Sequence, residues 1–273
     1  MEHSLPTALC ERYPIEREIA RGGMATVYLA RDTEGREVAV KVMDPRLADA
    51  LGAERFQREV AVVRGMEHPG IVPLWAAGEA DGRLYYVMPY IAGETLAQRL
   101  ERERRLPLAD ALRITDELAG ALGYAHARGV LHRDVKPENI LLEGGRALVA
   151  DFGLARAIGA ADYERLTQTG IIVGTAHYMS PEQLLEERDL DQRADIYSLA
   201  GILFEMLTGA PPFTAPNLTE LATRILRAPP PSARRLRPEV SESVDRVIVT
   251  ALAKSAGARY ATMAEFAAAL RGG

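Results

Sequence analysis

The sequence predicts an α+β protein built from two consecutive parts. Up to about residue 90, the apolar stretches mostly alternate with a period of two, as strands do. Beyond about residue 93, apolar residues recur every three to four positions, as in helices. A chain of 273 residues is long enough to bury a substantial core.

Two strands are clearest in the first part. Residues 37–43 alternate, with three valines on one face and Ala39 and Lys41 on the other. Residues 83–89 form a second β-rich run, which follows an Asp-Gly turn pair. Because a lone cation on an inward face needs a partner, Lys41 is a candidate functional residue.

Helical spacing is clearest in three segments. Residues 56–63 place apolar side chains on one face, with Glu59 on a flanking face. Residues 114–125 carry a longer apolar stripe, and residues 194–207 are apolar nearly all round, as in a buried helix. Gly209, followed by two prolines, ends this last helix.

Composition excludes several classes of protein. The net charge of −5 indicates no basic surface for nucleic acid or membranes. The single cysteine, Cys10, excludes an internal disulfide framework. There is no signal-peptide layout at the N-terminus, and no apolar run reaches the roughly 18 residues of a membrane helix. We therefore expect a cytoplasmic chain without a membrane segment, and we assign Trp75 to packing.

The most informative stretch is His-Arg-Asp-Val-Lys-Pro-Glu-Asn at residues 132–139. It places a carboxylate, an ammonium group and a carboxamide within six residues, and Asp151-Phe-Gly follows twelve residues later. A carboxylate can accept a hydroxyl proton, while an amide and a second carboxylate are oxygen ligands that suit Mg²⁺. This set predicts phosphoryl transfer.

These motifs resemble those of eukaryotic-like serine/threonine protein kinases, most closely the bacterial members, over nearly the whole chain. The resemblance implies a single kinase domain over residues 1–273 with a two-lobed fold. Residues 8–88 would form an antiparallel-sheet N-lobe with one main helix, residues 89–93 the hinge, and residues 94–271 a mostly helical C-lobe. It also implies transfer of the ATP γ-phosphoryl group to Ser or Thr hydroxyls of proteins, with Mg²⁺ as cofactor and Mn²⁺ as a substitute.

The resemblance also assigns catalytic roles. Asp134 would orient and deprotonate the acceptor hydroxyl, and Lys136 would neutralise the migrating phosphate. Lys41 would contact the α- and β-phosphates, held by the carboxylate of Glu59. Thr175 would contact the catalytic aspartate and lysine, a feature of Ser/Thr specificity. The metal ligands would be Asn139 and Asp151.

The phosphate-covering loop departs from the family pattern. Where the family favours Gly-x-Gly-x-x-Gly, this chain has Ala20 and Ala25 at the outer positions and keeps Gly22. Glycine permits close backbone approach, so the alanines are expected to alter loop motion without removing a catalytic group. The resemblance places the nucleotide against Ala20, Arg21, Gly22, Gly23, Val27, Ala39, Lys41, Met88, Pro89, Ile91, Leu141 and Asp151. Pro89 lacks an N–H but keeps the carbonyl that this role needs.

The activation segment would run from Asp151 to Glu182. In relatives the last glutamate pairs with an arginine, here Arg259, and an aspartate, here Asp195, caps the backbone at His132. Thr167 and Thr169 resemble a paired autophosphorylation site that regulates activity. A second copy of the chain would then be a partner in trans, as a transient dimer, besides protein substrates.

Two alternatives remain open at this point. A pseudokinase would bind nucleotide without turnover, and only the altered glycine loop favours it. A small-molecule phosphotransferase is disfavoured by the long activation segment, by Thr175 and by the Lys136-Pro137-Glu138 sequence.

Overall fold

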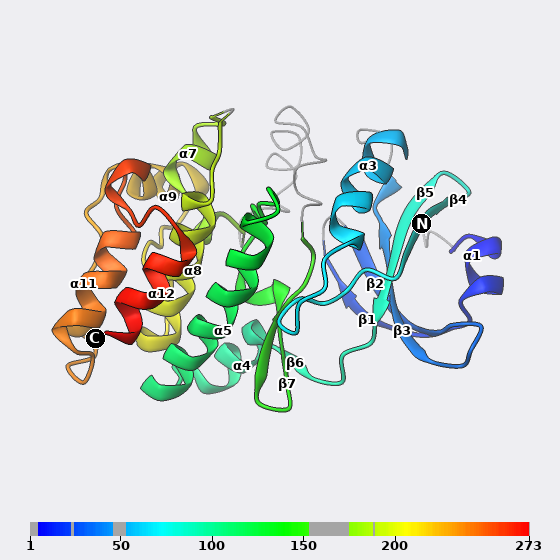
Figure 1. Ribbon diagram of the computed structural model, residues 1–273, viewed down its shortest axis with the longest axis horizontal. Helices are drawn as coiled ribbons and strands as arrows, with labels where there is room; N and C mark the ends of the chain where they lie inside the picture. Colours follow the sequence, from blue (N-terminus) through cyan, green and yellow to red (C-terminus); the bar gives the residue numbers. More distant parts are fainter. Residues whose placement is uncertain (1–4, 23–24, 46–52, 153–174, 188, 273) are drawn as a thin grey trace. The chain divides into compact units, whose positions relative to one another are not determined.

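The computed structural model describes residues 5–22, 25–45, 53–152, 175–187 and 189–272 (Figure 1). Strands dominate the first part of the chain and helices the second, so the α+β prediction is confirmed. The described residues form two compact units. Residues 5–67 and 72–92 belong to the N-terminal unit, and residues 68–71, 93–152 and 175–272 to the C-terminal unit.

A five-stranded antiparallel sheet organises the N-terminal unit, with the order β1-β2-β3-β5-β4. Its strands are β1 (Ile15–Arg21), β2 (Ala25–Arg31), β3 (Glu37–Met43), β4 (Ala76–Ala80) and β5 (Arg83–Pro89). The helices among its described residues are α1 (Thr7–Arg12) and α3 (Ala53–Arg64). The predicted strands coincide with β3 and β5, and the predicted helix lies within α3.

The two faces of this sheet differ, as the alternation in β3 predicts. Val38, Val40 and Val42 join a buried cluster that includes Leu9 and Tyr13, at α1 and just after it. Ala39 and Lys41 therefore lie on the opposite face, since successive side chains in a strand alternate. Helix α1 was not predicted from the sequence, and it is only six residues long.

The assignment of Trp75 to packing is wrong. Trp75 is 38% exposed, and the Arg36 guanidinium lies 5.0 Å from its ring centre. The Arg64 guanidinium donates to the Trp75 backbone carbonyl at 3.1 Å. A large aromatic ring can remain at the surface when a cation covers its face.

The C-terminal unit is mostly helical, with a small antiparallel sheet of order β6-β7-β8. The strands are β6 (Glu94–Thr95), β7 (Ile140–Glu143) and β8 (Arg146–Val149). The α-helices are α4 (Leu96–Glu103), α5 (Leu108–His126), α7 (Pro181–Leu184), α8 (Arg193–Thr208), α9 (Leu218–Arg227), α10 (Ala233–Leu236), α11 (Glu242–Ala251) and α12 (Met263–Arg271). The short 3₁₀ helices are η1 (Pro137–Asn139), η3 (Thr175–Tyr178) and η4 (Ala256–Ala258).

Helix α8 is the buried centre of this unit, as its sequence predicts. It packs against α5 and α11, and nearly every side chain from Ala194 to Leu207 is buried (Figure 1). Gly209 ends the helix with φ 90°, a left-handed conformation that favours glycine. The apolar stripe of α5 faces the same core, and Ile114, Leu118 and Leu122 are fully buried there.

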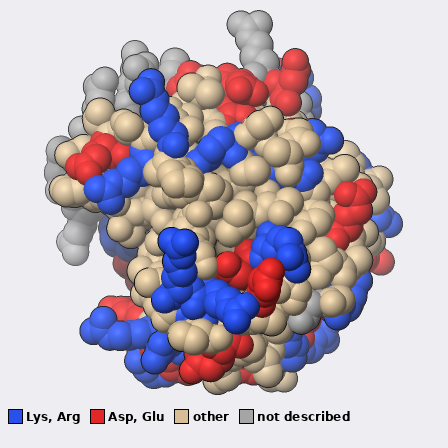
Figure 2. Space-filling model, turned by 90° about the vertical axis from the view of Figure 1, so that its left-hand side faces the viewer, with Lys and Arg blue, Asp and Glu red and all other residues tan. Residues whose placement is uncertain are grey.

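One end of the C-terminal unit, where α9, α11 and α12 lie, shows basic and acidic side chains interspersed (Figure 2). Single-sign stretches on this face are short. Among the helices within the described ranges, none has both the length and the apolar character that crossing a bilayer requires.

Candidate active site

Three of the predicted catalytic side chains meet on one short turn. The Asp134 carboxylate oxygen Oδ2 lies 2.8 Å from Lys136 Nζ and accepts a hydrogen bond of 3.1 Å from Asn139 Nδ2. Asn139 Nδ2 also donates to the Asp134 backbone carbonyl at 2.9 Å. The 3₁₀ helix η1 makes this possible, because its tight winding brings residue 139 back towards residue 134.

Asn139 is oriented by these bonds in a way that suits a metal ligand. Both bonds to Asp134 use the amide nitrogen, which leaves the amide oxygen for a cation. The side chain is largely buried, at 7% exposure, so its direction is well defined. Hard amide and carboxylate oxygens are the donors that Mg²⁺ takes from proteins, so Asn139 together with Asp151 fits this ion.

The backbone before Asp134 is held by a buried aspartate of α8. Asp195 Oδ2 accepts the His132 N–H at 2.9 Å, and Oδ1 accepts the Arg133 N–H at 2.8 Å. The cap predicted for Asp195 is thus confirmed. Arg133 has φ 66°, a conformation that is strained for a residue with a side chain. The two hydrogen bonds stabilise this strained turn.

Asp195 remains ionised although it is 1% exposed. Burial by itself raises the pKa of its carboxyl, but a 2.7 Å hydrogen bond from His126 Nε2 and the surrounding donors outweigh burial and lower the pKa. A charged acceptor makes stronger hydrogen bonds than a neutral one. The carboxylate is therefore a firm anchor for the turn at residues 132 and 133.

His132 connects the catalytic turn to the start of the predicted activation segment. Its Nδ1 accepts the Asp134 N–H at 3.2 Å, and its Nε2 lies 2.9 Å from the Ala150 carbonyl oxygen. A carbonyl can only accept, so Nε2 carries the proton and the ring is the neutral tautomer. The Phe152 ring packs edge-on at 4.7 Å between ring centres.

Asp151 lies between these two anchored residues. Its own φ is 63°, a second strained position near the candidate site. The Ala150 N–H donates to the Asn139 carbonyl at 2.9 Å. The backbones of the two candidate metal ligands are thus tied together within the C-terminal unit.

Several predicted nucleotide contacts share one face of the N-terminal sheet. Val27 lies opposite Lys41, and Lys41 lies opposite Tyr86 in the next strand. Two residue pairs further along, Ala39 lies opposite Met88. Residues directly opposite in antiparallel strands point to the same face, so Val27, Ala39, Lys41 and Met88 do so too. Lys41 Nζ lies 5.7 Å from the centre of the Tyr86 ring.

The described residues of the predicted phosphate-covering loop lie at the end of β1, just after it, and at the start of β2. Ala20 lies opposite Val27, and the Gly22 N–H donates to the Ala25 carbonyl at 2.9 Å. Ala20, Arg21 and Gly22 are exposed. Ala25 is the first residue of β2 and is 7% exposed, so this position belongs to the strand and its methyl group is packed.

The remaining predicted contacts are distributed over both units. Pro89 is the last residue of β5, and the half-buried Ile91 lies two residues later. Leu141 lies in β7 of the C-terminal unit. Glu59 lies in α3 and Thr175 begins η3, but the side chains of both fall outside what the structure describes. Gly23, Thr167 and Thr169 also lie outside the described residues.

The segment after η3 contains a buried ion pair, as expected for Glu182 and Arg259. The guanidinium donates to both carboxylate oxygens, at 2.6 and 2.8 Å. Burial raises the pKa of Glu182, but the hydrogen bonds and charge of Arg259 lower it by more, so the net pKa is below its ordinary value. The neighbouring Gln183, which the sequence analysis missed, donates from Nε2 to the Arg133 carbonyl at 2.7 Å.

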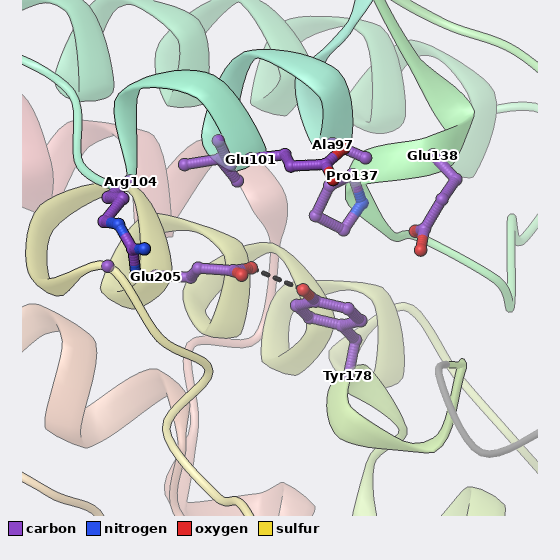
Figure 3. Close-up of a pocket in the computed structure, with 9 residues that line it drawn as sticks. Ala97, Glu101, Arg104, Pro137, Glu138, Tyr178 and Glu205 are labelled. Atoms are coloured by element: carbon purple, nitrogen blue, oxygen red, sulfur yellow. Dashed lines mark hydrogen bonds between the residues drawn. The ribbon is translucent and has the colours of Figure 1, made fainter.

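A pocket of about 400 Å³ that was not predicted from the sequence lies beside the catalytic turn (Figure 3). Pro137 and Glu138 line it together with residues of α4, with Tyr178 and with Glu205 of α8. The Tyr178 hydroxyl donates to the Glu205 carboxylate. A carboxylate in the apolar stretch of α8 was the available signal, because a buried charge requires a polar partner.

Glu205 is an unusual carboxylate within this pocket. Its burial raises the pKa; the hydrogen bond from Tyr178 acts in the opposite direction, and the nearby charge of Glu138 raises it again. The net pKa lies above the ordinary value. The lining of the pocket includes two further glutamates, Glu101 and Glu138, together with Arg104.

Comparisons with known proteins agree with this geometry. Residues 13–268 match the model of the protein kinase domain family. The chain is 40% identical over 272 residues to serine/threonine-protein kinase PknB of Mycobacterium leprae, covering 97% of this chain and 43% of that protein. It is 38% identical over 263 residues to serine/threonine-protein kinase PrkC of Bacillus subtilis, covering 95% of this chain and 40% of that protein.

The chain thus spans about two fifths of the length of the curated relatives it matches. The family model covers most of the chain, and the predicted two-lobed kinase fold, with its antiparallel sheet and its helical C-lobe, is confirmed. Both the sequence match and the Asp134 turn lead to one conclusion: the chain belongs to the protein kinase domain family.

Proposed function

We propose that this chain transfers the γ-phosphoryl group of ATP to serine or threonine hydroxyls of proteins. The observation that carries the proposal is the contact of Asp134 with both Lys136 and Asn139 on one anchored turn. Relatives at 38–41% identity are named serine/threonine-protein kinases, which supports the acceptor class.

Each side chain of this turn has a distinct role in the proposal. Asp134 accepts the proton of the acceptor hydroxyl and orients its oxygen. Lys136, 2.8 Å from that carboxylate, neutralises negative charge on the phosphoryl group in the transition state. Asn139 and Asp151 hold Mg²⁺, which offsets phosphate charge when bound; Mn²⁺ is the expected substitute.

The N-terminal unit supplies the nucleotide contacts in this proposal. Val27 and Ala39 cover the adenine, and Leu141 packs against it from the C-terminal unit. Met88 borders the adenine pocket, while the Pro89 carbonyl and the Ile91 N–H bind the base edge. Lys41 binds the α- and β-phosphates, with Glu59 as its partner, and the backbone at Ala20, Arg21, Gly22 and Gly23 covers the phosphates. Thr175 contacts Asp134 and Lys136.

The test is turnover of Mg-ATP on a generic basic protein, compared with a panel of small alcohols. Asp134→Asn keeps the size of the side chain and removes the base, so activity should fall at least about 100-fold. Asp116→Asn is the control, because that aspartate forms an exposed ion pair with Arg271 and should leave turnover unchanged. Phosphorylation of the alcohols alone, or ATP binding without turnover, would contradict the proposal.

We also propose that Thr167 and Thr169 are autophosphorylated in trans by a second copy of the chain, in a transient dimer. A phosphate adds nearly two negative charges, and an arginine such as Arg133 can bind it bidentately. Intact-mass spectra should show phosphate on the active protein and none on Asp134→Asn. Full activity of the double alanine variant would contradict this regulation.

The partners we propose are proteins, and nucleic acid is not among them, since the net charge is −5. Within a longer protein the domain would act on the cytoplasmic side.

The altered glycine loop has one specific consequence: Ala25→Gly and Ala20→Gly should change the KM for ATP without creating activity. An inactive parent that gains activity on these changes would favour a pseudokinase.

A further inference from the structure

The peptide group between Arg133 and Asp134 is held at both of its polar atoms. Its N–H, which belongs to Asp134, donates to His132 Nδ1 at 3.2 Å. Its carbonyl, which belongs to Arg133, accepts from Gln183 Nε2 at 2.7 Å. This peptide plane precedes the Cα of Asp134, so its rotation changes φ of Asp134 and thereby the direction of the carboxylate.

The held conformation is a strained one. Arg133 has φ 66°, and such a residue persists only when surrounding contacts over-determine its backbone. Asp195 binds the N–H groups of His132 and Arg133, on the N-terminal side of this peptide. The carbonyl of Arg133 receives its hydrogen bond from Gln183, which comes from a segment 50 residues further along the chain.

Gln183 is itself firmly placed. It is the third residue of α7 and closes a capping box, in which its Oε1 accepts the Ser180 N–H at 3.0 Å and its N–H donates to the Ser180 hydroxyl. The preceding residue, Glu182, forms the buried ion pair with Arg259. The oxygen and the nitrogen of the Gln183 side-chain amide therefore link the cap of α7 to the backbone beside Asp134.

The residue type is informative. A capping box accepts Glu as well as Gln, and a carboxylate is favourable near a helix N-terminus. The amide can accept from Ser180 and donate to Arg133 at the same time, whereas an ionised carboxylate can only accept. A carboxylate would place an oxygen against the Arg133 carbonyl oxygen.

We propose that Gln183 is a positioning residue for the transfer reaction, which sets the orientation of Asp134 through the Arg133 carbonyl. This inference rests on the proposed function. It adds to that function a residue that touches neither substrate nor metal and that acts through the peptide plane next to the base.

The chain contains a matched control. The capping box at α4 has the same arrangement, with Gln98 Oε1 accepting the Thr95 N–H at 2.8 Å and the Thr95 hydroxyl accepting the Gln98 N–H at 3.1 Å. Gln98→Glu and Gln183→Glu therefore make the same chemical change in the same motif. They differ in the hydrogen bond to Arg133, which belongs to Gln183.

We expect Gln183→Glu to lower kcat about tenfold or more, because it leaves a backbone acceptor facing a carboxylate. The KM for ATP should stay close to wild type, and the thermal midpoint should fall by less than in Gln183→Met, since the cap is retained. Gln98→Glu should leave kcat unchanged. Gln183→Met removes both functions of the amide, so it should match the loss of kcat and also lower the thermal midpoint.

The pH profile separates positioning from a general structural role. The introduced carboxyl can donate to the Arg133 carbonyl once it is protonated, so the kcat ratio of Gln183→Glu to wild type should rise towards one as pH falls. Hydrogen exchange of the peptide containing residues 133–135 gives a readout without turnover. It should be faster in Gln183→Glu and unchanged in Gln98→Glu.

Outcomes for the two proposals are separable. A wild-type chain without turnover contradicts the proposed function, and exchange at residues 133–135 then decides the role of Gln183. An active wild type with equal kcat in Gln183→Glu overturns the inference. The same holds if Gln98→Glu loses as much kcat, or if exchange at residues 133–135 does not change.

Discussion

Removal of the Glu182 carboxylate should destabilise the C-terminal unit strongly. The Arg259 side chain is 0% exposed and that of Glu182 is 9% exposed, and two hydrogen bonds of 2.6 and 2.8 Å join them. Arg259 also donates to the carbonyls of Ala253, Arg193 and Lys254, so it cannot leave its site without breaking those bonds. Glu182→Gln thus leaves a buried charge without its counter-charge.

The size of the effect follows from this burial. Breaking a buried pair by removing one partner costs about 3–5 kcal/mol in the free energy of unfolding. For a domain of this size each kcal/mol shifts the thermal midpoint by roughly 2–4 °C. We therefore expect Glu182→Gln to lower the midpoint by about 6–20 °C, as followed by circular dichroism or calorimetry.

A surface pair provides the control. Glu220 lies 2.5 Å from Arg224 with side chains that are 42% and 47% exposed, so Glu220→Gln should cost about 0–1 kcal/mol. The pKa of Glu182 in the folded chain is below its ordinary value of 4.5. Its contribution to stability is therefore present above that value and is lost as pH falls through the folded pKa. Equal midpoint shifts in the two variants at neutral pH would refute this reasoning.

Three further outcomes are expected. Glu205→Gln should raise the thermal midpoint at pH 7. The pKa of Glu205 is raised in the folded chain, so the stability that this residue contributes is complete below 4.5 and is lost as pH rises through the folded pKa, whereas glutamine stays neutral; a lower midpoint of the variant at pH 7 would contradict this. Asp151→Ala should abolish the Mg²⁺ dependence of ATP affinity in equilibrium titrations, and an unchanged dependence would exclude Asp151 as a ligand. Asp195→Asn should lower both kcat and the free energy of unfolding, the latter by about 1–3 kcal/mol, because one of two buried N–H groups loses its acceptor; wild-type values of both would show that the cap is dispensable.

The sequence by itself determined the features that depend on local spacing. The period of two in residues 37–43 places Lys41 opposite the valine face, and the apolar run of residues 194–207 becomes the buried helix α8. Asp134, Lys136 and Asn139 meet because they lie within one short turn. Such contacts follow from backbone geometry over a few residues, so a pattern can predict them.

Resemblance to relatives extended this to two contacts between distant segments, the Glu182–Arg259 pair and the Asp195 cap. Tertiary structure alone revealed the bond from Gln183 to Arg133 and the pocket that contains Glu205. In the sequence, Gln183 is one glutamine in an ordinary capping box and is equivalent to Gln98. The two glutamines differ in what the fold places beside the side-chain amide. The contact of Gln183 depends on how α7 packs against the catalytic turn. Such a contact between distant segments leaves no local periodicity in the sequence, so a pattern cannot predict it.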